Sequence, residues 1–412
     1  QLKIKQSLSK SKPNVLLNCQ RKIQMNKFER NYRMEEINSL YGNNRLNNKD
    51  STFRIEIESE YDCYNELHQH LAEAKKLNVD TDISRILEGG IFVHPDFDNY
   101  YVKNQIDFFS AIYEACDKAE YSPERIILWW GNANVKELYQ QWCDINKPTK
   151  LFKGVYYFPV WLFMLYANID NTSDYFDIDP AVKRTKLFTF FVGFEREHRI
   201  KAINFLYEND LLDSCEWTWA NSETHGLPEE LHPQIPKSAE GHAHYTEKST
   251  TENPGKEFFM LYENNYFDLI TETYYSNDYH QYEAYNEWNG IFFSEKIWRS
   301  IMNKRPFLLI GNKNALRELH NLGFKTFPTM FDESYDSIGD EERIYHVLDQ
   351  LKGLTVDEVH NNVYSKEVSE AVEHNYAQIK KILFSQDNAT VRFAELWTAE
   401  QNFCVVDNLP II

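Results

Sequence analysis

Residues 267–311 read FDLITETYYSNDYHQYEAYNEWNGIFFSEKIWRSIMNKRPFLLIG, and this stretch decides the predicted fold. An apolar strand is predicted over 266–272, a helix over 294–303 and a second apolar strand over 306–310. A strand, a helix and a strand in this order indicate a βαβ unit, in which the two strands are parallel.

The start of the predicted helix carries a candidate ligand site. Ser294 is a good N-cap residue, which puts Glu295 and Lys296 in the first turn. A helix N-terminus offers N–H groups and a partial positive charge, which suit a diphosphate, and Lys296 would add a full charge. Glu295 would accept hydrogen bonds from the two ribose hydroxyls, and Gly311 would let a ligand approach the backbone. The alternative is an ordinary helix start with surface charges.

The same alternation of strands and helices extends through the rest of the chain. It predicts an α/β fold with two Rossmann-like domains facing each other across a cleft, joined by a polar, acidic linker at 168–184. The other predicted strands are 52–59, 91–94, 125–130, 151–158, 186–192, 216–219 and 324–327. The other predicted helices are 64–77, 105–119, 135–143, 196–209, 314–322, 341–352 and a helical segment at 355–383.

Composition restricts the possible partners. The chain has 412 residues and a formal net charge of −19, which argues against nucleic acid as a partner. An anionic ligand would therefore need a local cluster of Lys and Arg. The most apolar stretch, 154–167, is shorter than the roughly 20 residues that a membrane span needs. The six cysteines form no CxxC pair and no signal peptide is visible, so we expect a cytoplasmic protein.

A second candidate element lies at 186–209. The strand KLFTFFVG is followed by a helix whose first turns contain His198 and Arg199. An arginine at the carboxyl end of a strand can bind phosphate with bidentate geometry. The alternative for Arg199 is an ordinary surface arginine.

These elements together resemble the donor domain of GT-B glycosyltransferases. The order is the strand and helix with Arg199, then FDLITE at 267–272, then FFSEKIWRSIMNKRPFLLIG at 292–311. It is most similar to the alpha-1,3-fucosyltransferase family, whose pattern has an acidic FEN strand, a Y-x-TEK helix start and a P-V-V-x-G strand. GFKTFPTMFDESYD at 323–336 is also similar to a motif in uncharacterised phage, giant-virus and bacterial proteins. The resemblance covers roughly 185–352.

The resemblance implies specific roles and domains. Arg199 and Lys296 would bind the phosphates of a nucleotide-sugar donor, Glu295 the ribose, and Glu272 would be the acid of the FEN strand. No further cofactor is implied. The resemblance makes 185–354 the nucleotide-sugar-binding domain, so that the preceding α/β domain (35–180) would be on the acceptor side. Composition and element order predict the other parts, a helical extension (355–412) and a basic, disordered tail (1–34), for which a targeting or docking arm is the alternative.

The implied reaction is transfer of a sugar to a glycan, lipid or protein acceptor with inversion at the anomeric carbon. A base from the N-terminal domain would deprotonate the acceptor hydroxyl. His94, Asp96 and Asp98, in FVHPDFDN after a short predicted strand, are the candidates, and a simple Asx-turn loop is the alternative.

Other features favour a reaction without a metal. A DxD triplet at 177–179 lies in the predicted linker and not near a strand end, and the histidines of a polar loop lack cysteines at matching spacing. That loop contains His225, His232, His242 and His244. The alternative to an enzyme is a non-catalytic module of the same fold, which binds nucleotide or glycan in a viral or surface assembly. A nucleotide-sugar epimerase or dehydrogenase is disfavoured because the chain has no GxGxxG fingerprint.

Overall fold

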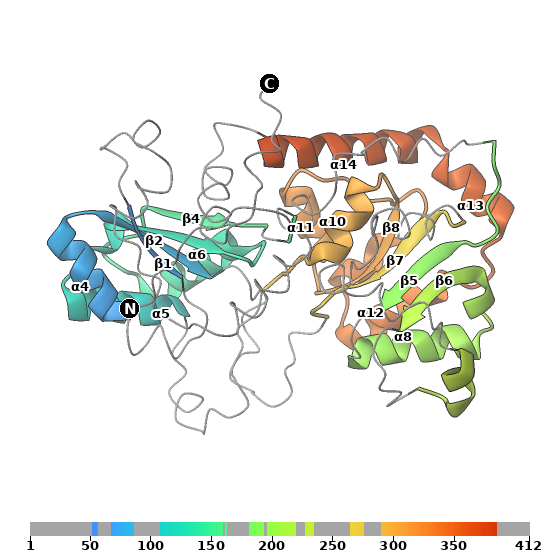
Figure 1. Ribbon diagram of the computed structural model, residues 1–412, viewed down its shortest axis with the longest axis horizontal. Coiled ribbons are helices and arrows are strands. Elements are labelled where there is room, and N and C mark those ends of the chain that lie inside the picture. The colour runs from blue at the N-terminus through green and yellow to red at the C-terminus, as the bar shows by residue number, and fades with distance from the viewer. Residues whose placement is uncertain are drawn as a thin grey trace, which may run out of the picture.

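The computed structural model describes residues 52–56, 67–85, 108–159, 161–162, 181–192, 196–219, 227–234, 264–275 and 290–384. Within these ranges the protein is α/β, with two four-stranded parallel sheets and helices beside each of them (Figure 1). This confirms the predicted α/β class with parallel strands. His94, Asp96 and Asp98 lie outside the described residues, as does the predicted strand 91–94.

The first sheet has its strands in chain order, β1-β2-β3-β4, and every neighbouring pair is parallel. Its strands are β1 (Thr52–Glu56), β2 (Asp80–Arg85), β3 (Ile126–Trp130) and β4 (Gly154–Tyr157). Its helices are α4 (Leu67–Leu77), α5 (Phe108–Ala119) and α6 (Val135–Asn146), with a short 3-10 turn η3 (Pro123–Arg125). Figure 1 shows these elements together at one end of the molecule.

The second sheet has the order β6-β5-β7-β8, again with parallel neighbours. Its strands are β5 (Phe188–Val192), β6 (Cys215–Trp219), β7 (Phe267–Thr271) and β8 (Phe307–Ile310). Its helices are α8 (Glu197–Glu208), α10 (Glu295–Met302), α11 (Ala315–Asn321), α12 (Asp340–Asp349), α13 (Val356–Val363) and α14 (Lys366–Phe384). The 3-10 turns are η5 (Leu212–Ser214), η6 (Glu229–Gln234) and η9 (Glu333–Ser337).

The second sheet reverses its strand order at β5. The chain passes from β5 to β6 on one side and then places β7 on the other side of β5. In parallel sheets of this kind, a crevice opens beyond the carboxyl ends of the two strands that flank such a reversal, and ligands bind there. The topology therefore predicts a ligand site at the carboxyl ends of β5 and β7.

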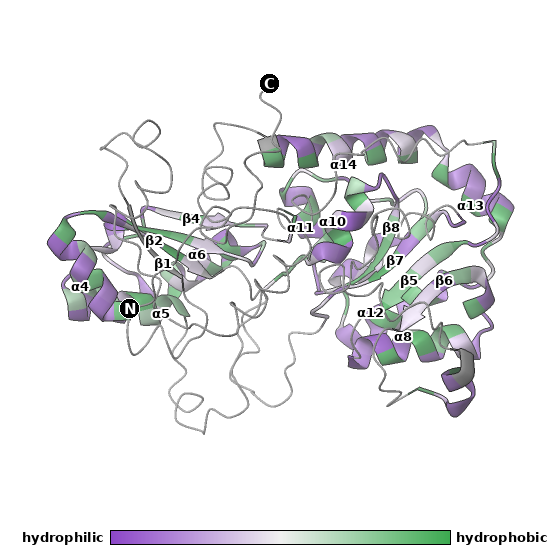
Figure 2. Ribbon diagram, in the orientation of Figure 1, coloured by the Kyte–Doolittle hydropathy of each residue, from purple (hydrophilic) through white to green (hydrophobic). Residues whose placement is uncertain are grey.

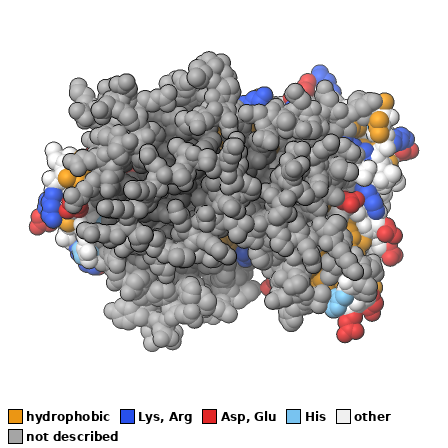
Figure 3. Space-filling model, in the orientation of Figure 1, with side chains coloured by type: hydrophobic (Ala, Val, Ile, Leu, Met, Phe, Trp, Pro, Cys, Tyr) orange, Lys and Arg blue, Asp and Glu red, His pale blue; other side chains and the backbone are white. Residues whose placement is uncertain are grey.

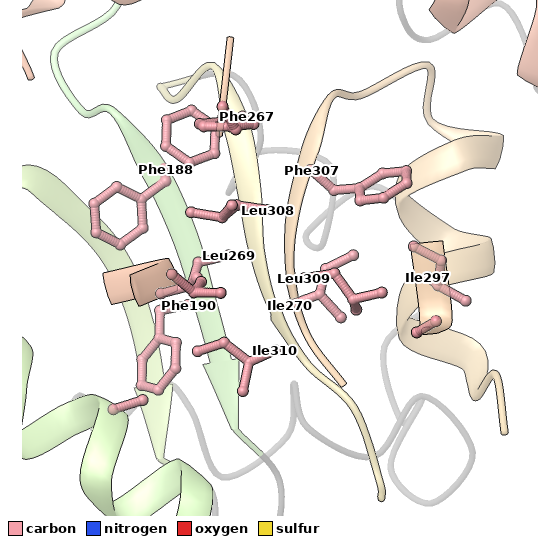
Figure 4. Packing of buried hydrophobic residues seen from close by; sticks show 14 of the residues in the cluster. Phe188, Phe190, Phe267, Leu269, Ile270, Ile297, Phe307, Leu308, Leu309 and Ile310 are labelled. Atoms are coloured by element: carbon pink, nitrogen blue, oxygen red, sulfur yellow. The ribbon is translucent and has the colours of Figure 1, made fainter. Parts of the chain in front are cut away.

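The core of the second sheet explains why three of its strands, β5, β7 and β8, read as mostly apolar runs. Every residue of β5, β7 and β8 is buried, as expected for parallel strands covered on both faces. Figure 4 shows Phe188, Phe190, Leu269 and Ile297 among the side chains that pack together here. Figure 2 shows β5 and β8 as mostly hydrophobic and the helices as two-faced.

One cluster of buried apolar residues joins the second sheet to the first half of the chain and to α14. Trp129 and Phe158 from the first half belong to it, and so do Val368 and Ile379 of α14. A separate cluster lies under α4, α5 and α6, and it includes Trp142. Buried apolar residues of the two halves therefore pack against one another.

The backbones of the two halves meet directly before α10. Ala133 N donates to Ile291 O at 2.7 Å, and Ile291 N donates to Asn134 Oδ1 at 2.9 Å. An antiparallel bridge pairs Asn132 with Phe292. A Cβ atom added at Gly290 would lie 2.9 Å from Asn132 Nδ2, so glycine suits this close approach.

Two details differ from the sequence predictions. Residues 324–327 form no strand, because Lys325 N donates to Asn375 Oδ1 and Phe327 N donates to Glu333 Oε1, each at 2.7 Å. Side chains thus satisfy N–H groups that a neighbouring strand would otherwise bind. The second difference is β2 (DTDISR), which has too few apolar residues to be predicted as a strand.

Candidate functional site

The start of α10 is held by a buried carboxylate at the end of β7. Ser294 is fully buried and is the N-cap, and its Oγ accepts from Lys296 N at 3.4 Å. Ser294 N donates to Glu272 Oε1 at 3.1 Å, and Ser294 Oγ donates to Glu272 Oε2. Thr273 N also donates to Glu272 Oε2, at 3.0 Å. Glu272, 1% exposed, therefore fixes the position of the helix start relative to the sheet.

Lys296 and Glu295 form the accessible part of this helix start. Lys296 Nζ donates to Glu295 Oε1 at 2.7 Å and to Ser294 Oγ at 3.2 Å. The side chains of Lys296 and Glu295 are 12% and 26% exposed. Ile297 and Trp298 are fully buried against the sheet, which anchors the first turn. The predicted N-cap of this helix is confirmed.

Arg199 and His198 reach the same point from α8, the helix that follows β5. Arg199 Nη2 donates to the carbonyl oxygens of Thr271 at 3.3 Å and of Glu272 at 3.1 Å. His198 Nε2 lies 2.9 Å from the carbonyl oxygen of Glu272. Both side chains are buried, at 2% and 7% exposure. They connect α8 to β7 across the reversal of strand order.

Burial and mutual charge shift the pKa values at this site. Burial, reinforced by Arg196, lowers the pKa of Arg199 to about 10, so the guanidinium stays charged at neutral pH. Burial also lowers the pKa of Lys296, an effect that Glu295 opposes. For Glu295, burial raises the pKa, but the charge and hydrogen bond of Lys296 dominate and bring it down to about 2.

Two further buried groups have shifted pKa values. Burial raises the pKa of Glu272, although Lys296 opposes the shift. Burial, with the neighbouring charge of Arg199, lowers the pKa of His198 well below its ordinary value, so its imidazole is neutral at pH 7. The charged guanidinium of Arg199 thus lies beside a neutral imidazole.

Cations exceed carboxylates around the start of α10. Arg199, Lys296 and Arg299 interact electrostatically with the acids Glu272 and Glu295, and Arg196 interacts with Arg199 and His198. The chain as a whole carries a net charge of −19. On the described surface in Figure 3, acidic and basic side chains are interspersed at the two ends of the molecule. Among the described residues, the start of α10 therefore carries a local excess of cations within an acidic chain, and Arg199 is the buried one of these four.

The structure brings together four of the predicted ligand-binding residues, Arg199, Glu272, Glu295 and Lys296. Gly311 follows β8 directly, and Glu272 N donates to Ile310 O at 2.8 Å, which places Gly311 beside the same edge. The loop histidines 225, 242 and 244 lie outside the described residues, together with the predicted catalytic residues.

Sequence reasoning missed a contribution from the first sheet. The buried Tyr157 hydroxyl, at the end of β4, has no hydrogen-bond partner among the described residues. Burial raises its pKa well above the ordinary value, and the negative charges of Glu272 and Glu318 add to this. A tyrosine at the end of a predicted strand was the available signal, but only the topology shows which residues lie near it.

Comparison of the chain with protein-family models, with curated proteins and with solved structures gives no match. Within the part of the chain that the structure describes, no helix combines the length and the apolar character needed to cross a membrane. The same residues include no group of three or more His, Cys, Asp or Glu arranged to hold a metal ion.

Proposed function

We propose that this chain is a glycosyltransferase of the GT-B type, which binds a nucleotide-sugar donor at the start of α10. The observation that carries the proposal is the convergence of two cations at one end of the second sheet. Arg199 comes from the helix after β5, and Lys296 from the helix after β7. Both lie at the reversal of strand order, where sheets of this kind bind ligands.

The electrostatics favour an anionic ligand. The groups that bring the pKa of Glu295 down to about 2 stabilise negative charge at this position. A diphosphate carries more charge than a carboxylate and has oxygen acceptors on both phosphorus atoms. The end of a helix adds N–H groups and a partial positive charge. A nucleoside diphosphate is the ligand class that fits this combination.

Each residue then has a distinct task. Lys296 exchanges its bond to Glu295 for a phosphate oxygen, and Glu295 turns its carboxylate to the ribose hydroxyls. Arg199 neutralises the phosphates from the side of α8. Glu272 uses both oxygens on Ser294 and Thr273, so it positions the helix start and does not itself contact the donor.

The reaction is a displacement at the anomeric carbon. An acceptor hydroxyl of a glycan, lipid or protein forms the new C–O bond, and the bond from the anomeric carbon to the diphosphate oxygen breaks. The proton of the acceptor passes to a base from the first half, for which His94, Asp96 and Asp98 are the candidates. Lys296 and Arg199 stabilise the charge on the leaving diphosphate, and the transition state resembles an oxocarbenium ion.

The test is consumption of nucleotide sugars by the full chain. UDP-glucose, UDP-galactose, GDP-mannose and GDP-fucose are incubated with the wild type and with Lys296→Ala, and released UDP or GDP is measured. One donor should be hydrolysed slowly without an acceptor. Lys296→Ala should reduce that rate by at least about 100-fold, because one cation acting on the leaving group contributes about 3 kcal/mol.

The matched control is Lys118→Ala. Lys118 Nζ pairs with Glu114 at the same 2.7 Å distance, but its side chain is 48% exposed on α5. This variant should keep the wild-type rate. No diphosphate release with any donor, together with no nucleotide binding, would refute the proposed function.

A further inference from the structure

The imidazole of His198 has one nitrogen that the described fold leaves available. Nε2 lies 2.9 Å from the carbonyl oxygen of Glu272, and the described residues provide no hydrogen bond to Nδ1. A carbonyl oxygen can only accept, so Nε2 must carry the proton. Because burial and the charge of Arg199 keep the ring neutral, Nδ1 then has a lone pair and is an acceptor only.

The ring is also fixed in orientation. Tyr275 stacks on it, with 5.3 Å between ring centroids and an interplanar angle of 22°. On Tyr275, the Arg343 guanidinium lies 4.5 Å from the ring centroid, and Arg343 Nη2 donates to Tyr275 O at 2.8 Å. The Tyr275 hydroxyl donates to the backbone of Asp340. The imidazole therefore keeps its direction without the ligand, which reduces the entropic cost of binding.

Because Nδ1 is an acceptor only, it excludes ionised phosphate oxygens as partners and favours groups that donate a hydrogen bond. Phosphate oxygens that are ionised are acceptors, so they would repel a lone pair. The cations Arg199 and Lys296 beside the ring disfavour its protonation, since both charges contribute to the low pKa of His198. A ligand group that donates a hydrogen bond fits this nitrogen, and hydroxyl groups are the donors that a nucleotide sugar offers.

We propose that His198 Nδ1 accepts a hydrogen bond from a hydroxyl of the bound donor, and that His198 thereby helps to select a hydroxyl-bearing ligand over its deoxy analogue. The inference rests on the proposed donor site and adds a residue that selects among ligands of that site. The hydroxyl belongs either to the ribose or to the transferred sugar, and the experiment below distinguishes the two.

Two isosteric variants separate the roles of the two nitrogens. Gln has an amide nitrogen near the position of Nε2, so His198→Gln keeps the donor to Glu272 O and removes the acceptor at Nδ1. Asn has its amide near the position of Nδ1, so His198→Asn keeps an acceptor there and loses the donor. Affinities for UDP, GDP and their sugar conjugates are measured by calorimetry, and folding is checked by thermal unfolding.

The inference predicts that His198→Gln weakens the tightest-binding nucleotide about tenfold, close to 1.4 kcal/mol, while His198→Asn weakens it less. The ribose is the partner if the deficit appears with the free diphosphate and disappears with its 2′,3′-dideoxy analogue. The transferred sugar is the partner if the deficit appears only with the sugar conjugate. Wild-type affinity in His198→Gln overturns the inference, as does an equal or larger loss in His198→Asn.

A measurement on the wild type covers the case in which both variants unfold. With nitrogen-15-labelled histidine, NMR should show the neutral Nε2–H tautomer, and ligand binding should shift the Nδ1 resonance in the direction of hydrogen bonding. A protonated or unshifted Nδ1 with nucleotide bound overturns the inference but leaves the donor site intact. If the wild type binds no nucleotide, the proposed function itself fails.

Discussion

The first sheet has its described strands in chain order, whereas the second sheet places β5 between β6 and β7. In the second sheet, charged residues meet where the order reverses: β7 leads directly into Glu272, which is bonded to the start of α10, and Arg199 donates to the Glu272 carbonyl. In the first sheet, β1 and β2 end in the charged Glu56 and Arg85, and β3 and β4 end in the uncharged Trp130 and Tyr157. The described strands of the first sheet have no such reversal, as expected if the second sheet holds the donor.

The way in which helices follow the strands explains why the cations meet at the second sheet. In the second sheet the helices after β5 and β7 both begin at the reversal, so Arg199 and Lys296 approach one point from separate segments. Buried cations remain there because the Thr271 and Glu272 carbonyls accept from Arg199, and Glu295 accepts from Lys296. Such groups would be costly in a core without these partners.

The largest expected effect is a loss of stability with or without a loss of nucleotide binding, depending on which of the two buried clusters is changed. Trp298→Ala, in α10, should lower the free energy of unfolding by about 3–5 kcal/mol and abolish nucleotide binding, because the helix start loses its anchor. Trp142→Ala, in α6, should cost a similar amount and leave the affinity of the folded fraction unchanged. Denaturant unfolding and calorimetry measure both. An equal loss of affinity in the two variants would break the proposed division between the sheets.

The second prediction concerns the carboxylate that holds α10. Glu272→Ala should reduce the free energy of unfolding by about 2–3 kcal/mol, because Ser294 N–H and O–H groups lose their buried acceptor. Glu318→Ala is the matched control. Glu318 is also buried, at 5% exposure, but its carboxylate accepts from Asn321 Nδ2 in the same helix turn. If urea unfolding shows that Glu318→Ala lowers the free energy of unfolding as much as Glu272→Ala does, the proposed role of Glu272 in holding α10 is refuted.

The third prediction uses acid. The folded-state pKa of Glu295 is about 2 against an ordinary 4.5, so its carboxylate stabilises the fold above pH 4.5. This contribution, on the order of 3 kcal/mol, is lost as the pH falls from about 5 to 2. Glu295→Gln should therefore lose less stability than the wild type over this range. Glu114→Gln, which removes an exposed carboxylate from α5, should follow the wild-type curve.

The smallest effect compares two tyrosine hydroxyls. Tyr121 Oη donates to Val79 O at 2.7 Å and accepts from Thr81 Oγ1 at 3.0 Å, so Tyr121→Phe should cost about 1 kcal/mol. Tyr157 Oη has no partner among the described residues, so Tyr157→Phe should change the free energy of unfolding by less than about 0.5 kcal/mol. A loss above 1 kcal/mol for Tyr157→Phe in thermal unfolding would contradict this difference.

Much of the fold follows from local patterns. The mostly apolar strand at 188–192, the apolar strand at 307–310 and the N-cap at Ser294 were predicted because burial on both faces and helix capping leave direct marks in sequence. β2 was missed because Thr81 and Ser84 are polar but buried. Their burial depends on partners from distant segments, such as Tyr121, which no local pattern reveals.

The candidate site was predictable in part for the same reason. Arg199 and Lys296 were found from helix starts, which are local features. The contact between His198 and Glu272 was not predicted, because it joins two residues that are 74 positions apart in the chain. Strand order decides such contacts, and strand order is not written in the periodicity of either strand.

The most direct measurement is a calorimetric cycle with two ligands and two proteins. A nucleoside diphosphate and its nucleoside are titrated into the wild type and into Lys296→Ala. The account predicts that the diphosphate gains at least about tenfold in affinity over the nucleoside in the wild type, and that Lys296→Ala loses most of this gain. Equal gains in the two proteins, or no gain in the wild type, would contradict a diphosphate site at the start of α10.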